Sequence, residues 1–262
     1  MDKQFKAFAS NLSMRLDFIT GEPALLISRS LIIADPHLGA EHDYRSEGIR
    51  MPSRTPDIRK KLEALIRKTR AKRLVILGDV KHRVPGISFQ EEREVPELLG
   101  KLSEKVSVEV VPGNHDGWLE KLCPDITMHP SGGIALGKFW LAHGHAWPSD
   151  RAMKADTIII GHNHPQVEFR DRLGKVWREK VWLRAPLMRK KLSVHYKTLP
   201  KKIPDVLLMP AFGELVGGWA VNRPNDDGKL VGGLGPITRC ADIRHALAYL
   251  LDSTFLGEVS KI

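Results

Sequence analysis

The sequence has 262 residues, of which 42% are hydrophobic and 27% are charged. These proportions are those of a soluble globular chain, and they exclude a disordered, collagen-like or coiled-coil protein. The 2 cysteines cannot build a disulfide framework or a cysteine-rich zinc site, and the formal charge of +10 favours polyanionic partners without naming one.

No stretch of the sequence predicts a membrane or export segment. Charged and polar residues interrupt the apolar residues of positions 1–14, so these positions form no signal-peptide core. The apolar runs, such as Thr157–Ile160, are far too short to span a bilayer. Together with the low cysteine content, this predicts a cytoplasmic protein without a membrane partner.

The first two-thirds of the chain repeats one pattern, an apolar run followed by a polar loop. Such runs are typical of strands buried on both faces of a layered α/β sheet, and they occupy residues 31–34, 74–77, 106–111, 139–142 and 157–160. Between them, apolar periodicity predicts helices over 55–69, with Thr55 as N-cap, and over 89–103. Residues 40–53 have no periodicity and are expected to form a long loop.

Beyond Pro165 the pattern becomes β-rich. Hairpins are predicted over 167–183 and 249–259, an apolar strand followed by a glycine-rich turn over 205–222, and a basic loop over 189–202. No linker or internal repeat divides the sequence. We therefore expect a single domain over 1–262, with its polar motifs within 30–165 and a β-rich part over 166–262.

Each of the five apolar runs ends in residues that can bind metal ions. In chain order these motifs are Asp35-Pro36-His37, Gly78-Asp79, Gly113-Asn114-His115-Asp116, His143-Gly144-His145 and Gly161-His162-Asn163-His164. The carboxyl ends of strands in an α/β sheet meet at one edge, so these side chains are expected to lie close together. Carboxylate, imidazole and amide ligands without a thiolate indicate Mn²⁺, Fe²⁺ or Zn²⁺.

The order of these motifs resembles that of the calcineurin-like metallophosphoesterase superfamily. The resemblance implies an α/β (α+β) fold of four layers, in which a central β-sandwich is flanked by helices. It also implies two divalent metal ions, with Mn²⁺ preferred and Fe²⁺, Zn²⁺ or Ni²⁺ as alternatives. One ion would be bound by Asp35, His37 and His164, the other by Asn114, His143 and His162, and both by Asp79 as the bridge.

The activity that the resemblance implies is metal-dependent hydrolysis of a phosphoric ester. A hydroxide that bridges the two ions would attack phosphorus without a covalent enzyme intermediate. His115 would assist the leaving group as a general acid or by stabilising its charge, and Asp116 would orient His115 or tune its charge. His145 is a candidate for contact with the phosphate or for holding a metal ligand in position.

One motif departs from the superfamily pattern. Many relatives carry Gly-Asp-x-x-Asp, whereas this chain has Gly78-Asp79-Val80-Lys81-His82, with a histidine in place of the second acid. The acid partner of the catalytic histidine is therefore unassigned. Lys81 and His82 become candidates for binding a phosphate-rich substrate, and His42 is a further candidate for reaching the site.

The substrate is less narrowly defined than the metal motifs. Residues 209–212, 217–222 and 235–236 resemble phosphoesterases grouped with DNA-repair helicases and ligases, among them the bacterial ligase-associated DNA damage response endonuclease. This resemblance favours a phosphodiesterase or nuclease acting on DNA or RNA in repair, with nucleic acid and a repair helicase or ligase as partners. The basic stretch from Arg184 to Lys202 is either a solvated surface or part of such an interface.

Two alternatives to a nuclease stay open. One is a phosphatase or phosphodiesterase for small phosphoesters or nucleotides, and the other is a non-catalytic scaffold that binds proteins. The oligomeric state is also open, a dimer included.

Overall fold

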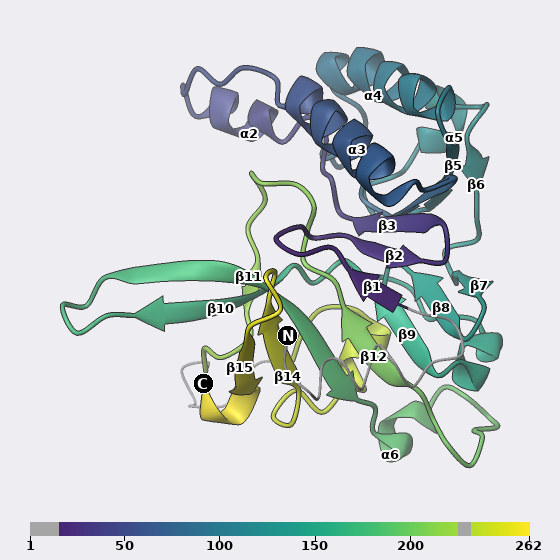
Figure 1. Ribbon diagram of the computed structural model, residues 1–262, viewed down its shortest axis with the longest axis vertical. Helices are drawn as coiled ribbons and strands as arrows, with labels where there is room; N and C mark the ends of the chain where they lie inside the picture. The colour runs from purple at the N-terminus through teal and green to yellow at the C-terminus, as the bar shows by residue number, and fades with distance from the viewer. Residues whose placement is uncertain (1–15, 225–231) are drawn as a thin grey trace.

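The computed structural model describes residues 16–224 and 232–262 as two β-sheets that lie face to face, with helices outside them (Figure 1). The expectation for positions 1–14 lies outside these described residues. Within the described ranges, no helix is long and apolar enough to cross a membrane.

The first sheet has six strands in the order β1 to β6. Their bounds are Leu16–Phe18 (β1), Leu25–Ile27 (β2), Ser30–Ala34 (β3), Arg73–Leu77 (β4), Ser107–Val111 (β5) and Thr127–Met128 (β6). Strands β3 to β6 are parallel, and parallel neighbours need a crossover connection. The helices α3 (Thr55–Thr69) and α4 (Phe89–Ser103) supply two of these crossovers and confirm the two predicted helices.

Both crossover helices bury an apolar face against the first sheet. Leu62 of α3 and Leu98 of α4 lie in one core cluster with Leu31 and Ile33 of β3. Helix α4 begins with a capping box between Ser88 and Glu91, and its first turn is therefore fixed by reciprocal hydrogen bonds. Helix α3 differs from the prediction by one position, because Arg54 is the N-cap and Thr55 is already helical.

The second sheet has nine strands. Seven follow the order β13-β10-β11-β12-β9-β8-β7, while β14 pairs with β11 and β15 with β14. Their bounds are Ile134–Leu136 (β7), Phe139–Ala142 (β8), Thr157–Ile160 (β9), Pro165–Arg170 (β10), Val176–Pro186 (β11), Asp205–Leu208 (β12), Trp219–Ala220 (β13), Leu247–Leu250 (β14) and Phe255–Glu258 (β15). The β14–β15 pair is the predicted C-terminal hairpin.

The β10–β11 hairpin extends well beyond the body of the molecule (Figure 1). The two strands pair antiparallel from Gln166 opposite Lys180 to Arg170 opposite Val176. Beyond the hairpin, β11 continues into the sheet, where it pairs with both β12 and β14. This second pairing explains why the strand runs past the predicted end at residue 183.

Successive side chains of a strand point to opposite faces of its sheet, so each sheet packs against the other sheet on one face and against helices on the other. Ile32 of β3 and Val75 of β4 pack between the sheets against Ile159 of β9 and Leu207 of β12. The outer face of the second sheet is covered by short helices, namely η1 (Asp150–Lys154), α6 (Arg189–Leu192) and α7 (Pro236–Arg239). The remaining short helices are α5 (Leu119–Leu122) and η2 (Val259–Lys261). Helices, two sheets and an outer cover of short helices confirm the predicted fold class.

The segment predicted as a long loop over 40–53 contains a short helix, α2 (Glu41–Ser46). Contacts with distant residues hold this helix in place. Gln90 of α4 donates to Glu41 at 3.3 Å and accepts from Arg45 at 2.6 Å. Because these partners are remote in the sequence, local periodicity gave no sign of the helix. The predicted loop over 189–202 likewise begins with a short helix, α6.

Candidate metal centre

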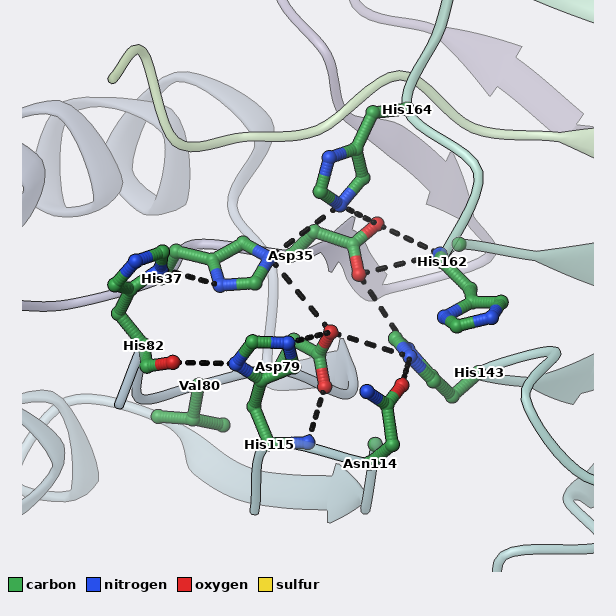
Figure 2. A network of polar contacts seen from close by, with 12 residues as sticks. Asp35, His37, Asp79, Val80, His82, Asn114, His115, His143, His162 and His164 are labelled. Carbon is green, nitrogen blue, oxygen red and sulfur yellow. Dashed lines mark hydrogen bonds and ion pairs between the residues drawn. The ribbon is translucent and has the colours of Figure 1, made fainter. Parts of the chain in front are cut away.

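The seven side chains predicted as metal ligands lie together where strands of both sheets end (Figure 2). They form two groups whose ligand atoms lie within 4.8 Å of one another, with Asn114 beside the second group. The first group is Asp35, His37 and His164, and the second is Asp79, His143 and His162. This division matches the one that the resemblance implied.

Asp79 lies between the two groups. Its Oδ2 atom is 3.6 Å from His37 Nε2 and 3.4 Å from His143 Nε2. Its Oδ1 atom accepts a hydrogen bond from the backbone N–H of His115 at 2.9 Å, which holds the carboxylate in place. Asn114 Oδ1 is 3.3 Å from His143 Nε2. Asp79 therefore occupies the position that a bridging carboxylate needs.

The backbone at these positions has an unusual conformation. Five of the predicted ligands have a positive φ between 43° and 68°, namely Asp35, His37, Asp79, His162 and His164. Side-chain-bearing residues rarely adopt this left-handed region, and each such residue costs about 1–3 kcal/mol. Strain of this kind persists where the surrounding structure holds it, and it clusters at functional sites.

Three glycines let the backbone approach the ligands closely. A β-carbon on Gly78 would overlap the imidazole of His143, and one on Gly113 would overlap the carboxylate of Asp79. A β-carbon on Gly161 would lie 2.6 Å from Asp35 Oδ2. Glycine is thus required at these three positions, because any side chain there would collide with a predicted metal ligand.

Hydrogen bonds to two backbone carbonyls fix which ring nitrogens face the cluster. His143 Nδ1 donates to Leu77 O at 2.9 Å, and His164 Nδ1 donates to Gly217 O at 2.9 Å. The Nε2 atoms of both rings therefore point inward, where His164 Nε2 lies 3.3 Å from His37 Nε2. Lone pairs that converge with carboxylate oxygens repel one another unless a cation lies among them. The donor set therefore fits divalent metal ions.

The pKa values of the imidazoles follow from burial and from the two carboxylates. Burial lowers the pKa of His37 to about 3 and that of His162 to about 4, so both rings are neutral at pH 7. Burial also opposes the charged form of His143, but the hydrogen bond to Asp79 and the charge of Asp35 raise its pKa to about 9. The two carboxylates thus stabilise the protonated, positively charged form of His143.

His115 faces the same cluster. Its Nδ1 atom donates to the carbonyl oxygen of His82, and its Nε2 atom lies 3.9 Å from Asp79 Oδ2. The His82 carbonyl therefore fixes the ring with Nε2 toward the predicted metal ligands. This position is compatible with a group that assists the leaving oxygen of a bound phosphoester.

Asp116 differs from its expected position. Its carboxylate accepts hydrogen bonds from the backbone N–H groups of Val80 and Gly113, each at 2.8 Å. Among the described residues it has no hydrogen bond to the His115 ring. The orientation of His115 comes from the His82 carbonyl, and Asp116 instead joins the two loops that carry Asp79 and Asn114.

Lys81 is likewise turned away from the cluster. Its side chain is 1% exposed, and its Nζ atom donates to the carbonyls of Arg83 at 2.7 Å and Gly86 at 2.8 Å. The expectation that Lys81 binds substrate is not supported by this position, because two backbone carbonyls hold the amine. Lys81 instead stabilises the loop that carries His82.

The other two substrate-binding candidates lie beside the cluster. The His145 ring is 5.2 Å from that of His143, and its buried Nδ1 atom has no hydrogen-bond partner among the described residues. His82 is 20% exposed and lies at an open cavity of about 540 Å³. The cavity is lined by His37, Ala40, Asp43, Tyr44, Glu47, His82, His115, His164 and Leu215–Gly217.

Asp43 also lines this cavity, but it belongs to no sequence motif and was not predicted as a site residue. Its Oδ2 atom lies 2.7 Å from His82 Nε2. The neighbouring His42, which the sequence suggested, lines a different surface with Arg45 and Met51. No motif marks Asp43, and its position depends on helix α2, which was not predicted either.

Comparisons with known proteins identify a matching family and similar structures. A model of the calcineurin-like phosphoesterase family matches residues 28–196. The nuclease MPE of Pseudomonas putida has a similar structure, with a TM-score of 0.53 and 20% identity over 92% of this chain and 98% of that chain. Yfce, a phosphoesterase from E. coli, gives a TM-score of 0.40 and 16% identity over 87% and 97% of the two chains. A comparison with curated proteins found no match.

The sandwich fold and the clustered histidines and aspartates define a metal-dependent phosphoester hydrolase. The family model spans more than half of the sequence and includes every motif from Asp35 to His164. The chain belongs to the calcineurin-like phosphoesterase family, and the resemblance seen in the sequence is confirmed. The family uses divalent metals, and the two groups described above are the candidate sites for them.

Proposed function

We propose that this protein is a two-metal phosphodiesterase that cleaves nucleic acid. The observation that carries the proposal is the position of Asp79, whose Oδ2 atom lies within 3.6 Å of His37 Nε2 and within 3.4 Å of His143 Nε2. A carboxylate shared between two groups of imidazole, amide and carboxylate ligands is the arrangement that two neighbouring divalent cations favour.

The residues divide into two ligand sets. One ion would be held by Asp35, His37 and His164, the other by Asn114, His143 and His162, with Asp79 shared. When bound, two such ions neutralise charge on a phosphate and lower the pKa of a coordinated water. Backbone N–H donors to Asp35 and Asp79 hold these carboxylates before any ion arrives.

His115 is assigned to the leaving group. Its Nδ1 proton is committed to the His82 carbonyl, so Nε2 is the atom that faces a bound substrate. Protonated, this nitrogen can give a proton to the departing oxygen, and such positioned acids contribute about 10²–10⁴-fold to rate. Asp116 acts indirectly, because it braces the loops on which Asp79 and Asn114 stand.

Two features support a polymeric substrate over a small phosphoester. The cavity above the cluster is open and about 540 Å³ in volume, so a chain can pass across it. The β10–β11 hairpin begins directly after His164, and its exposed outer part carries Arg170, Arg172 and Lys175, which have no ion-pair partner among the described residues. Phosphate backbones bind such cations through release of counterions.

Aromatic side chains on the same hairpin add a second kind of contact. Trp177 is 41% exposed, and its ring stacks on Phe169 with the centroids 5.5 Å apart. An exposed aromatic face beside cations is typical of surfaces that bind single strands. The similar fold of a nuclease from Pseudomonas putida agrees with this substrate class.

The basic stretch from Arg184 to Lys202 is less favoured as a nucleic-acid surface. Arg184 hydrogen-bonds Asp205, Arg189 donates to two backbone carbonyls, and Lys191 donates to Arg239 O. Helix α6 follows the end of β11 that is remote from the hairpin (Figure 1). A role in DNA repair, with a helicase or ligase as partner, rests on the sequence resemblance and is part of the proposal.

The experiment compares three substrates in the presence of Mn²⁺: single-stranded DNA, bis-p-nitrophenyl phosphate and p-nitrophenyl phosphate. We expect cleavage of the DNA and of the diester, both abolished by EDTA and by Asp79→Asn. Activity confined to the monoester would contradict a nuclease and support the small-phosphoester alternative. No hydrolysis with any divalent metal would support the scaffold alternative.

A further inference from the structure

A chain of hydrogen bonds links helix α2 to the first ligand group. Asp43 Oδ2 lies 2.7 Å from His82 Nε2, and His82 Nδ1 lies 3.2 Å from His37 Nδ1 (Figure 2 shows the contact between the two rings). The opposite nitrogen of His37, Nε2, faces His164 and Asp79. Three side chains from α2, the loop after β4 and the loop after β3 thus form one line that ends at the cluster.

Only one placement of protons along this line makes His37 a metal ligand. The Asp43 carboxylate can only accept, so His82 Nε2–H donates to it and leaves a lone pair on His82 Nδ1. His37 Nδ1–H then donates to that lone pair, which leaves the His37 Nε2 lone pair directed at the cluster. A proton on His82 Nδ1 would force the other tautomer of His37, with a proton where the ion should bind.

We propose that Asp43 and His82 are positioning residues that hold His37 as an Nε2 ligand and thereby raise the affinity of the first ion. The proposal rests on the proposed function in assigning His37 to a metal ion. Carboxylates that hydrogen-bond a metal-bound histidine fix its tautomer and ring orientation, and their loss costs about 10–100-fold in metal affinity. Here a second histidine lies between the carboxylate and the ligand.

This assignment accounts for the departure from the superfamily motif. His82 stands where many relatives carry a second acid, and here it connects Asp43, from a distant part of the chain, to His37. Helix α2 is held firmly enough for this, because Arg45 donates to Gln90 at 2.6 Å and to Met51 O at 3.0 Å. The contact between Asp43 and His82 is therefore part of an anchored segment.

The test is a calorimetric titration of metal-free protein with Mn²⁺. In the wild type we expect two ions per chain. In Asp43→Ala one of the two sites should weaken by about 10–100-fold while the other is unchanged. His82→Ala should give the same selective loss, and the double variant should lose no more than either single variant, since both residues act through His37.

Glu47→Ala is the matched control. Glu47 follows the same helix and lines the same cavity, and its replacement removes one negative charge, but it has no contact with His82 in the described structure. The metal affinities of this variant should equal those of the wild type. An equal loss in Glu47→Ala would show that the cavity's net charge, and not the relay, sets affinity, and would overturn the proposal.

Other outcomes are equally decisive. Unchanged affinity at both sites in Asp43→Ala, with loss of metal in Asp79→Asn, would overturn the relay and leave the proposed function intact. Failure of the wild type to bind Mn²⁺ or any other divalent ion would overturn both. Binding of a third ion would overturn the relay as well, because His37, His82 and His115 lie close enough to share one. Thermal unfolding of each metal-free variant checks that the fold is retained.

Discussion

The carboxylate of Asp116 accepts a hydrogen bond from the backbone N–H of Val80 at 2.8 Å. Because Asp116 also accepts from Gly113, it joins the loop after β4 to the loop after β5. Replacing Asp116 with Ala leaves the buried N–H of Val80 and the part-buried N–H of Gly113 without this partner, at about 1–3 kcal/mol for each buried group. We expect a loss of this size in the free energy of unfolding, measured by urea denaturation of metal-free protein. A variant as stable as the wild type would contradict the bracing role.

Asp79→Asn removes the charge shared between the two ligand groups. Transition-state charge stabilisation by metal ions is worth several kcal/mol, so hydrolysis of bis-p-nitrophenyl phosphate should fall by about 10²-fold or more. Metal analysis should show fewer than two ions per chain. Asp171→Asn, at the exposed tip of the hairpin, is the control and should keep both ions and full rate on this small diester. Full activity in Asp79→Asn would refute the bridge.

His115→Asn should separate metal binding from leaving-group assistance. The substituted side chain cannot donate a proton, so kcat should fall by about 10²–10⁴-fold while both ions stay bound. The loss should be smaller for p-nitrophenyl esters than for DNA, because nitrophenolate leaves without a proton. Equal losses on the two kinds of substrate would show that His115 does not protonate the leaving group.

The exposed cations of the β10–β11 hairpin should affect the binding of DNA but not the hydrolysis of a small diester. Replacing Arg170, Arg172 and Lys175 together with Ala should raise KM for single-stranded DNA and reduce the slope of its salt dependence by up to about one unit for each cation that binds a phosphate. Hydrolysis of bis-p-nitrophenyl phosphate should be unchanged. The matched control replaces three exposed cations elsewhere, Lys197, Lys201 and Lys202. Equal weakening of DNA binding in that control would show that the protein's total charge, and not the position of the hairpin cations, determines DNA affinity.

Lys180 predicts a pH dependence of stability. Burial, aided by the charge of Lys61, lowers the pKa of this amine from 10.5 to about 8, although its ammonium group donates to the carbonyls of Ala211 and Gly213. Between pH 8 and 10.5 the unfolded chain therefore binds the proton more strongly than the folded chain. The free energy of unfolding should rise with pH across this window, by about 1–3 kcal/mol relative to Lys180→Met.

Urea denaturation of both proteins at several pH values measures this difference. Lys197→Met serves as the control, because Lys197 is exposed and its replacement should leave the rise unchanged. A difference between the wild type and Lys180→Met that does not vary with pH would contradict a lowered pKa.

The sequence predicted which side chains lie together at the cluster, because each motif directly follows an apolar strand. Parallel strands that end at one edge bring Asp35, Asp79 and Asn114 together from positions far apart in the chain, and this follows from topology alone. The helices α3 and α4 were also predictable, since each carries an apolar stripe that the first sheet covers.

Features held by remote contacts were not predictable. Helix α2 depends on Gln90 of another helix, so neither the helix nor its residue Asp43 was visible in the sequence. Lys81 next to Asp79 suggested a phosphate contact, but the direction of a long side chain depends on which carbonyls are left unpaired nearby. Asp116 was misplaced for the same reason, because its backbone partners lie on a loop that only the fold brings close.

The glycines at positions 78, 113 and 161 carry no functional group, yet a single added methyl group at any of them would collide with an imidazole or a carboxylate of the centre. These three glycines therefore resist substitution even though they take no part in the chemistry. Random mutagenesis aimed at a different metal specificity should therefore yield no functional variants at these three glycines. Useful substitutions should lie at residues whose side chains point into open space.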